Sequence, residues 1–334
     1  MSEFRQNITT GEWVIIATER AKRPADFTKR SGKRVNLTSH DDACPFCKNG
    51  KAEKEKPIYQ LSGKKGWELR VLHNKYAALQ KKAKPARVQD GMYVKAGGYG
   101  SAEVLIETPR HDLTIATMKQ KTVEAVVNTY RLRYREIAKD RDINFINIFR
   151  NYGEAAGASL VHPHSQIIAS LVAPPHVSDQ IFYARNHCNT WGACVYCEMI
   201  AYERKQKKRI VFESDHHIAL CPYASRSPFE VRIYPKRHSS VFGNITENES
   251  CDLAYILRNV LGKIYRLLDD PDYNYIIRSI TTNDGEVQFY HWYLVIIPKL
   301  RKIAGFEMGT GIYINVSEPE ASALQLSSVK VTDL

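Results

Sequence analysis

The chain has 334 residues, enough for two domains of ordinary size. Its 48 Lys and Arg against 36 Asp and Glu give a net charge of +12, which favours anionic partners such as phosphorylated metabolites, nucleotides or nucleic acid. The sequence shows no signal peptide and no apolar run of membrane-span length, and its seven cysteines fit reduced thiols better than a disulfide framework. We therefore expect a cytoplasmic protein that has no membrane partner.

A metal-ligand pattern opens the first half of the chain. Cys44 and Cys47 form a Cys-x-x-Cys pair, and His111 and His162 follow it. Two cysteines and two histidines suit tetrahedral Zn²⁺. The competing interpretation is that these are reduced core cysteines and hydrogen-bonded histidines. Four protein ligands would leave no open position on the metal, so the pattern is also compatible with a purely structural site.

Between the two histidines the sequence predicts a helix and then a strand. Thr117 and Gln120 have the spacing of a capping box, and apolar residues recur behind them with helical period up to Ile137. The segment 143–149 is rich in β-formers. This half should therefore place its last histidine on a further strand.

The segment 151–166 carries the catalytic prediction. Small residues at 153 and 155–158 let the backbone approach a ligand and present N–H groups to phosphate. In a strand, His162, His164 and Gln166 would share one face. With His162 bound to metal, the His164 imidazole is left to attack phosphorus and form a phosphoramidate, and the Gln166 amide can hold phosphate oxygens without activating water. Otherwise His164 is simply a packed polar residue.

The second half repeats the metal pattern. The break at 173–175 predicts domains at 1–173 and 176–334. The repeated ligands, which would bring the zinc content to about two per chain, are Cys194, Cys197, His238 and His291. The intervals between the paired histidines are nearly equal in the two halves, which suggests a duplicated unit.

The repeat continues after His238 but loses the catalytic residues. Thr246 and Glu249 predict a capping box, and a β-rich segment follows at 273–279. Tyr293 and Val295 stand where His164 and Gln166 stand in the first half, so the second half should be chemically silent. The charged stretch 203–209 predicts a solvated turn or helix end rather than a nucleic-acid-binding segment.

These residues resemble the galactose-1-phosphate uridylyltransferase family, the nucleotidyltransferase branch of the histidine-triad superfamily, over nearly the whole chain. The signature is His-Pro-His-Ser-Gln at 162–166, where hydrolases carry a third His in place of Gln166. The resemblance implies an α+β fold of two histidine-triad-like halves, each an antiparallel sheet with packed helices. It implies His164 as the nucleotidylated nucleophile, and the substrate-binding residues that it implies are Arg20, Arg23, Asn74, Asn151, Gly157, Ser159, Phe306 and Glu307.

The implied reaction is double displacement between a nucleotide sugar and a sugar 1-phosphate. Uridylyl transfer between UDP-glucose and a hexose 1-phosphate is the leading prediction, with a homodimer that shares its sites. The Cys-x-x-Cys of the second metal pattern resembles ADP-glucose phosphorylase instead, so an ADP-sugar phosphorylase using phosphate is the first alternative. A zinc-ribbon nucleic-acid-binding protein is the alternative from another class. It would not need the Gly-rich turn before the signature, so we expect no nucleic-acid partner.

Overall fold

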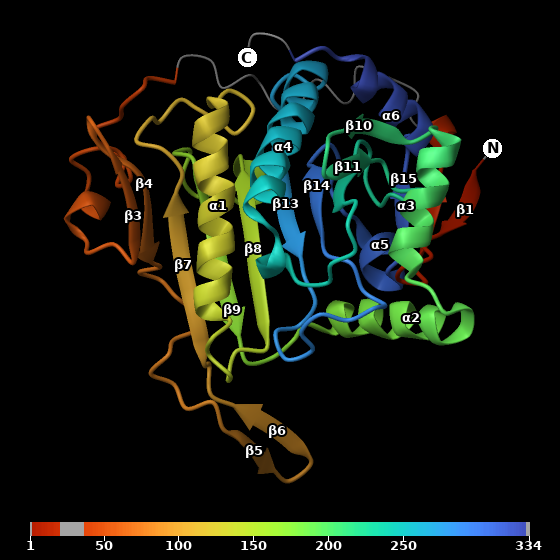
Figure 1. The fold of residues 1–334 in the computed structure, drawn as a ribbon, viewed down its shortest axis with the longest axis horizontal. Helices are drawn as coiled ribbons and strands as arrows, with labels where there is room; N and C mark the ends of the chain where they lie inside the picture. The colour runs from red at the N-terminus through yellow and green to blue at the C-terminus, as the bar shows by residue number, and fades with distance from the viewer. Residues whose placement is uncertain (1, 21–36, 332–334) are drawn as a thin grey trace.

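One antiparallel sheet of ten strands runs through the molecule, as seen in this computed structural model, which describes residues 2–20 and 37–331 (Figure 1). The first half contributes β3 (Tyr59–Gly63), β4 (Gly66–His73), β7 (Gly100–Ile106), β8 (Phe145–Tyr152) and β9 (His164–Ser170). The second half contributes β10 (Ile210–Glu213), β11 (His217–Leu220), β12 (Val231–Pro235), β13 (Tyr273–Arg278) and β14 (Tyr293–Pro298). The spatial order is β10-β11-β12-β14-β13-β8-β9-β7-β4-β3.

This order is symmetric about its centre. Outward from the central β8–β13 pair, the strands of the two halves follow one another in matching spatial order. Strand β9 therefore corresponds to β14, β7 to β12 and β4 to β11. The registers agree: Phe149 pairs with Gln166 in the first half, Ile276 pairs with Val295 in the second, and Phe149 and Ile276 pair with each other. The duplicated unit that the histidine spacing suggested is thus present as a pseudo-two-fold arrangement.

Two long helices cover one face of the sheet. They are α1 (Gln120–Ile137) and α4 (Glu247–Leu267), which pack side by side as corresponding elements of the two halves (Figure 1). Their apolar stripes meet the inward side chains of the central strands, among them Ile148, Ile167 and Tyr275, in one buried core. The expected α+β fold is therefore confirmed.

The two helices begin differently. Thr246 and Glu249 form the predicted capping box of α4 through both reciprocal hydrogen bonds. The corresponding prediction for α1 is wrong, because the N-cap of α1 is Lys119 and makes no side-chain cap bond. The Thr117 hydroxyl instead accepts from the backbone N–H of Thr114 at 3.0 Å, closing a turn ahead of the helix.

Smaller elements surround the sheet. Beside the second half, β1 (Glu3–Gln6), β2 (Trp13–Ile16) and β15 (Tyr313–Asn315) form a three-stranded sheet from both ends of the chain, and the 3₁₀ turn Thr18–Arg20 follows β2. The remaining helices are α2 (Pro175–Trp191), α3 (Val195–Gln206), α5 (Gly305–Thr310) and α6 (Pro319–Ser328). The hairpin β5 (Arg87–Asp90) and β6 (Tyr93–Ala96) projects from the first half (Figure 1). Short 3₁₀ turns lie at Lys51–Lys54, Glu154–Ala156 and Phe242–Asn244.

No helix among residues 2–20 and 37–331 combines the length and the apolar character needed to cross a membrane. The predicted domain boundary at 173–175 falls where β9 has ended and α2 begins. Because β8 and β13 are hydrogen-bonded neighbours, the sheet is continuous across the two halves. The division into two domains stays a prediction.

Candidate active site and metal centres

The first predicted ligand set comes together at the end of the sheet near β7 and β9. Cys44, Cys47, His111 and His162 are all buried, and their ligand atoms lie within 4.8 Å of one another. The Nδ1 atoms of His111 and His162 each lie 3.5 Å from the Cys47 sulfur. Residues from three separate parts of the chain therefore converge on one small volume, as a bound metal would require.

The hydrogen bonds of His162 orient it as a ligand. Its Nε2 lies 2.8 Å from the Thr108 carbonyl, which can only accept, so Nε2 carries the proton and the Nδ1 lone pair faces the sulfurs. Burial lowers the pKa of His162 to about 4, which keeps the ring neutral. Burial raises the pKa of Cys47 to about 11, and a metal would displace that proton. Two thiols and two Nδ1 atoms fit Zn²⁺.

The second ligand set repeats this geometry. The ligand atoms of Cys194, Cys197, His238 and His291 also lie within 4.8 Å of one another. His238 and His291 approach the Cys197 sulfur through Nδ1 at 3.3 and 3.7 Å. Nε2 of His291 donates to the Pro235 carbonyl at 2.8 Å, the counterpart of the bond from His162 to Thr108. The duplication therefore extends to the groups that orient the ligands.

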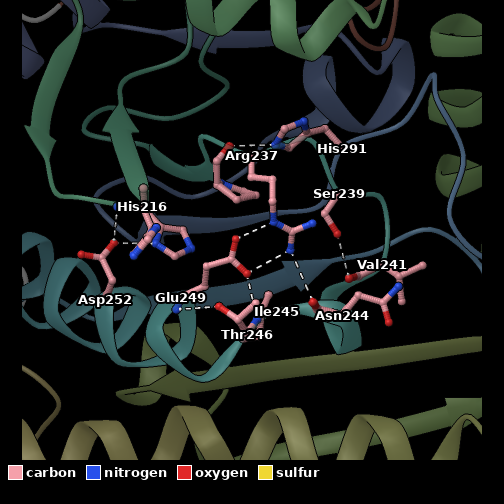
Figure 2. A network of polar contacts seen from close by, with 12 residues as sticks. His216, Arg237, Ser239, Val241, Asn244, Ile245, Thr246, Glu249, Asp252 and His291 are labelled. Carbon is pink, nitrogen blue, oxygen red and sulfur yellow. Dashed lines mark hydrogen bonds and ion pairs between the residues drawn. The ribbon is translucent and has the colours of Figure 1, made fainter.

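The loop that carries His238 is fixed to α4 by charge (Figure 2). Arg237 donates to both carboxylate oxygens of Glu249, at 2.7 and 2.9 Å. Glu249 is the same residue that completes the capping box with Thr246. On the other side of His238, Ser239 and Ser240 donate to Glu286 at 2.8 Å. The helix cap and the metal ligand thus share one hydrogen-bonded support.

His164 has the geometry of a nucleophile. It begins β9, two residues after the metal ligand, so His162 lies just ahead of the strand rather than within it. Its Nδ1 lies 2.7 Å from the His162 carbonyl and must donate to it, which leaves the Nε2 lone pair free to attack. Burial lowers the pKa of His164, so the ring is neutral near pH 7. Phe46 packs against it, with ring centroids 5.4 Å apart.

A cavity of about 610 Å³ lies in front of His164. Its lining brings together four of the predicted catalytic and substrate-binding residues, Asn74, Ser159, His164 and Gln166. The walls are the loop of the first Cys-x-x-Cys pair and the segment after β4. We call this space the catalytic cavity.

The small-residue turn lies beside this cavity. Gly153 and Gly157 have φ of 87° and 83°, a left-handed conformation that side chains with a Cβ resist. Asn151 Nδ2 donates to the Gly157 carbonyl at 3.5 Å, and Asn274 on β13 donates to Asn151 Oδ1 at 2.9 Å. Asn274 also bonds the Ala156 carbonyl at 2.8 Å. Sequence reasoning missed Asn274, whose relevance follows from the β8–β13 pairing.

Three other predicted substrate-binding residues that the structure describes, Arg20, Phe306 and Glu307, do not line this cavity. Arg20 ends a 3₁₀ turn beside the small three-stranded sheet, and Phe306 and Glu307 are on α5, which contacts β15. The Glu307 carboxylate accepts from the Ala304 N–H at 3.2 Å, across the start of that helix. Arg23 lies outside the described residues. The fold of one chain therefore does not bring the side chains of Arg20, Phe306 and Glu307 into the cavity in front of His164.

A buried ion pair lies behind the catalytic strand. Arg150 and Glu107 are 1% and 0% exposed, and the guanidinium Nε lies 3.1 Å from both carboxylate oxygens. Arg150 also donates to the Tyr273 hydroxyl at 2.6 Å. The Glu107 N–H donates to the Pro163 carbonyl at 3.1 Å, between His162 and His164. The sequence offered no signal for this pair, since neither residue belongs to a motif.

Comparison with known proteins agrees with this geometry in both halves. The family profile described as galactose-1-phosphate uridyl transferase, N-terminal domain, matches residues 1–174, and that for the C-terminal domain matches residues 146–313. The chain belongs to this family. Its members are nucleotidyltransferases, and this protein is an enzyme of that class, as the resemblance predicted.

Two curated relatives match this family member over nearly its full length. ADP-glucose phosphorylase of Arabidopsis thaliana is 34% identical over 99% of this chain and 93% of that protein. Galactose-1-phosphate uridylyltransferase of Thermotoga maritima is 31% identical over 99% of each. Among solved structures, the Arabidopsis ADP-glucose phosphorylase with bound ADP-glucose superposes with a TM-score of 0.85 at 32% identity, covering 99% and 100% of the two chains. A uridylyltransferase structure superposes with a TM-score of 0.76 at 26% identity, covering 98% of each.

Proposed function

We propose that this family member transfers a nucleoside monophosphate through a covalent intermediate on His164. The observation that carries the proposal is the bond from His164 Nδ1–H to the His162 carbonyl, because it fixes Nε2 as the free nucleophilic nitrogen at the catalytic cavity. UDP-glucose is the leading donor and a hexose 1-phosphate the leading acceptor. Family profiles cover both halves, and the Thermotoga uridylyltransferase aligns over the full chain.

The two steps balance without a further reactant. Nε2 of His164 attacks the α-phosphorus of the nucleotide sugar, a P–N bond forms, and the bond to the bridging oxygen breaks. The electron pair leaves with sugar 1-phosphate. A phosphate oxygen of the acceptor then attacks the same phosphorus, and Nε2 regains its lone pair. Throughout, Nδ1 keeps its proton against the His162 carbonyl, and Gln166 supplies amide N–H groups to phosphate oxygens.

A specific observation supports a second candidate. The Arabidopsis ADP-glucose phosphorylase shares 34% identity, and its ADP-glucose complex superposes with a TM-score of 0.85. In that case His164 would carry an adenylyl group, and inorganic phosphate would be the acceptor. The nucleophile and the order of steps are the same in both candidates.

One experiment tests the mechanism and separates the candidates. The protein is incubated with UDP-glucose and, separately, with ADP-glucose, and intact mass is measured after denaturation. A uridylyl or an adenylyl adduct identifies the donor directly. His164→Ala should form neither adduct, whereas His187→Ala, a change on α2 outside the lining of the catalytic cavity, should behave as wild type. Turnover by His164→Ala at the wild-type rate would refute the mechanism.

Both ligand sets fit zinc, and we propose about two zinc ions per chain. When bound, the ion held by Cys44, Cys47, His111 and His162 would supply a rigid attachment for the segment that ends in His164. The second ion would stabilise the silent half. Metal analysis of the purified chain tests the count. A chain that binds no metal and tolerates the loss of all four paired cysteines would contradict it.

We further propose a homodimer with composite active sites. Arg20, Phe306 and Glu307 lie away from the catalytic cavity of their own chain, which supports a role in the site of a partner. Glu307→Ala mixed with His164→Ala should regain activity, because one mixed site would have both residues intact. Proven subunit exchange without complementation would refute the shared site. The free cysteines fit the proposed cytoplasmic location.

A further inference from the structure

A second cavity, of about 880 Å³, lies in the half that lacks a nucleophile. Its walls come from one face of α3, from the segment after β11 and from the two ends of the chain. We call it the C-terminal cavity. The residues on α3 are Glu198, Met199, Tyr202, Glu203 and Gln206.

Strand registers show that this cavity corresponds to the catalytic cavity. In the first half Leu72 pairs with Val104, and Val104 with Gln166. In the second half Leu220 pairs with Arg232, and Arg232 with Val295. Leu72 and Leu220 are therefore equivalent positions. The residues that follow them along the chain are equivalent too, so that Asn74, Lys75 and Tyr76 correspond in order to Pro222, Tyr223 and Ala224. Each set of three lines its own cavity.

The walls that follow the Cys-x-x-Cys pairs correspond as well. Asn49 and Met199 each stand two residues after the second cysteine of their pair, and each lines its cavity. Ala52 and Tyr202 correspond in the same way and also line the two cavities. The C-terminal cavity is therefore the duplicate of the catalytic cavity, with different side chains.

The part of the site that would hold phosphate has been lost. Tyr293 replaces the nucleophile and is buried, with its hydroxyl accepting from Gln180 at 2.9 Å. Val295 replaces Gln166 and has no donor. Neither residue lines the C-terminal cavity. At the position that corresponds to Gln166, the duplicate therefore has no side-chain amide donor.

The charges that line the cavity also disfavour phosphate. Arg209 binds Glu203 at 2.9 Å and Glu320 at 2.6 Å, and Arg5 binds Glu320 at 2.9 and 3.0 Å. Arg232 binds Glu230 at 2.9 Å. These guanidinium groups are neutralised by carboxylates. Beyond them, the described part of the chain contributes one further cation, Lys208, to the lining, together with three further carboxylates, those of Glu3, Glu198 and Glu318.

Two features remain that suit a heterocyclic base. Tyr223 lines the cavity with the guanidinium groups of Arg5 and Arg209 over its ring, 4.5 and 5.1 Å from the ring centroid. Tyr202 also lines the cavity, beside Met199, and is 56% exposed. Aromatic faces of this kind stack on bases. Glu203 is 2% exposed, and its Oε2 has no hydrogen-bond partner in the described part of the chain. An amino group on a ligand would satisfy that oxygen.

We propose that the C-terminal cavity binds an unphosphorylated nucleoside whose base carries an amino group, stacked on Tyr202 with Glu203 as acceptor. This proposal rests on the proposed function in one respect: the catalytic cavity, which is the counterpart of the C-terminal cavity, binds a nucleotide. The preference for a ligand without phosphate separates the two cavities. The catalytic cavity should bind AMP or UMP more tightly than the nucleoside, and the C-terminal cavity the reverse.

The test is calorimetric titration of the zinc-loaded full chain with adenosine, inosine and AMP. Inosine is the matched control, since its base carries a carbonyl oxygen where that of adenosine carries the amino group. Adenosine should bind at least about tenfold more tightly than inosine. Tyr202→Ala should weaken adenosine about tenfold or more, and Tyr202→Phe should retain binding. Both variants should form the nucleotidyl-enzyme as wild type does.

Further variants locate the binding and separate it from catalysis. Asn74→Ala changes the catalytic cavity and should leave the adenosine titration unchanged. Glu203→Gln should remove the preference for adenosine over inosine even if it also lowers stability. Absence of saturable adenosine binding, or binding that Asn74→Ala abolishes and Tyr202→Ala leaves intact, overturns the proposal. Failure of the proposed function would appear separately, as absence of a covalent adduct with either nucleotide sugar.

Discussion

The ion pair behind the catalytic strand makes a quantitative prediction. In Arg150→Met the Glu107 carboxylate, 0% exposed in the native protein, would remain buried without its partner. Breaking a fully buried pair by removing one partner costs about 3–5 kcal/mol, because the remaining charge is left uncompensated. The Tyr273 hydroxyl would also lose its 2.6 Å bond from Arg150, worth about 1 kcal/mol. We therefore expect a loss of at least about 3 kcal/mol in the free energy of unfolding.

The double variant separates a buried charge from lost packing. Glu107→Leu combined with Arg150→Met should recover most of the loss, because replacing a buried pair by apolar side chains is often neutral or stabilising. The assay is urea unfolding of the zinc-loaded chain, followed by nucleotidyl-enzyme formation. Lys139→Met is the control, since its partner Glu136 is exposed and this change should leave unfolding unaltered. A loss under about 1 kcal/mol for Arg150→Met, or additive losses in the double variant, would refute the reasoning.

Three further predictions concern the catalytic and metal-binding residues and the helix cap. Gln166→His places an ionisable group beside the phosphate and should raise the ratio of hydrolysis to transfer; an unchanged product ratio would show that Gln166 does not protect the intermediate. Cys194→Ser should lower thermal stability but spare adduct formation, whereas Cys44→Ser should lower both, as melting and intact-mass measurements would show. Hydrogen bonding to Arg237 lowers the pKa of Glu249 to about 2 from 4.5. Its stabilisation is therefore present above pH 4.5 and lost as pH falls towards 2. Because half of the Arg237 side chain is exposed, Glu249→Gln should lower the free energy of unfolding by only about 1 kcal/mol at pH 7. Equal urea midpoints for wild type and Glu249→Gln at that pH would contradict this.

The sequence by itself predicted the chemistry that we propose for the chain. Ligand type and order indicated both metal sets, and the signature at 162–166 indicated the nucleophile, because these depend on which atoms a side chain carries. The near-equal intervals between histidines revealed the duplication. Thr246 and Glu249 predicted the start of α4, since a capping box forms between residues three apart.

The tertiary structure decided what depends on contacts between distant segments. The capping box predicted at Thr117 failed because that hydroxyl closes a turn with Thr114. The stretch 203–209, expected to be solvated, buries Glu203 and Arg209, because Glu320 from the far end of the chain and Arg5 from the near end complete their ion network. Burial of a charge depends on its partner in space.

The second cavity shows the same limit of sequence reasoning. The replacement of His164 by Tyr293 and of Gln166 by Val295 is visible in the sequence and predicts a silent half. That this half keeps the corresponding cavity emerges only from the strand registers, which make Arg232 and Tyr223 the counterparts of Val104 and Lys75. Register is set by pairing between strands that are far apart in the chain, so local sequence carries no information about the space they enclose.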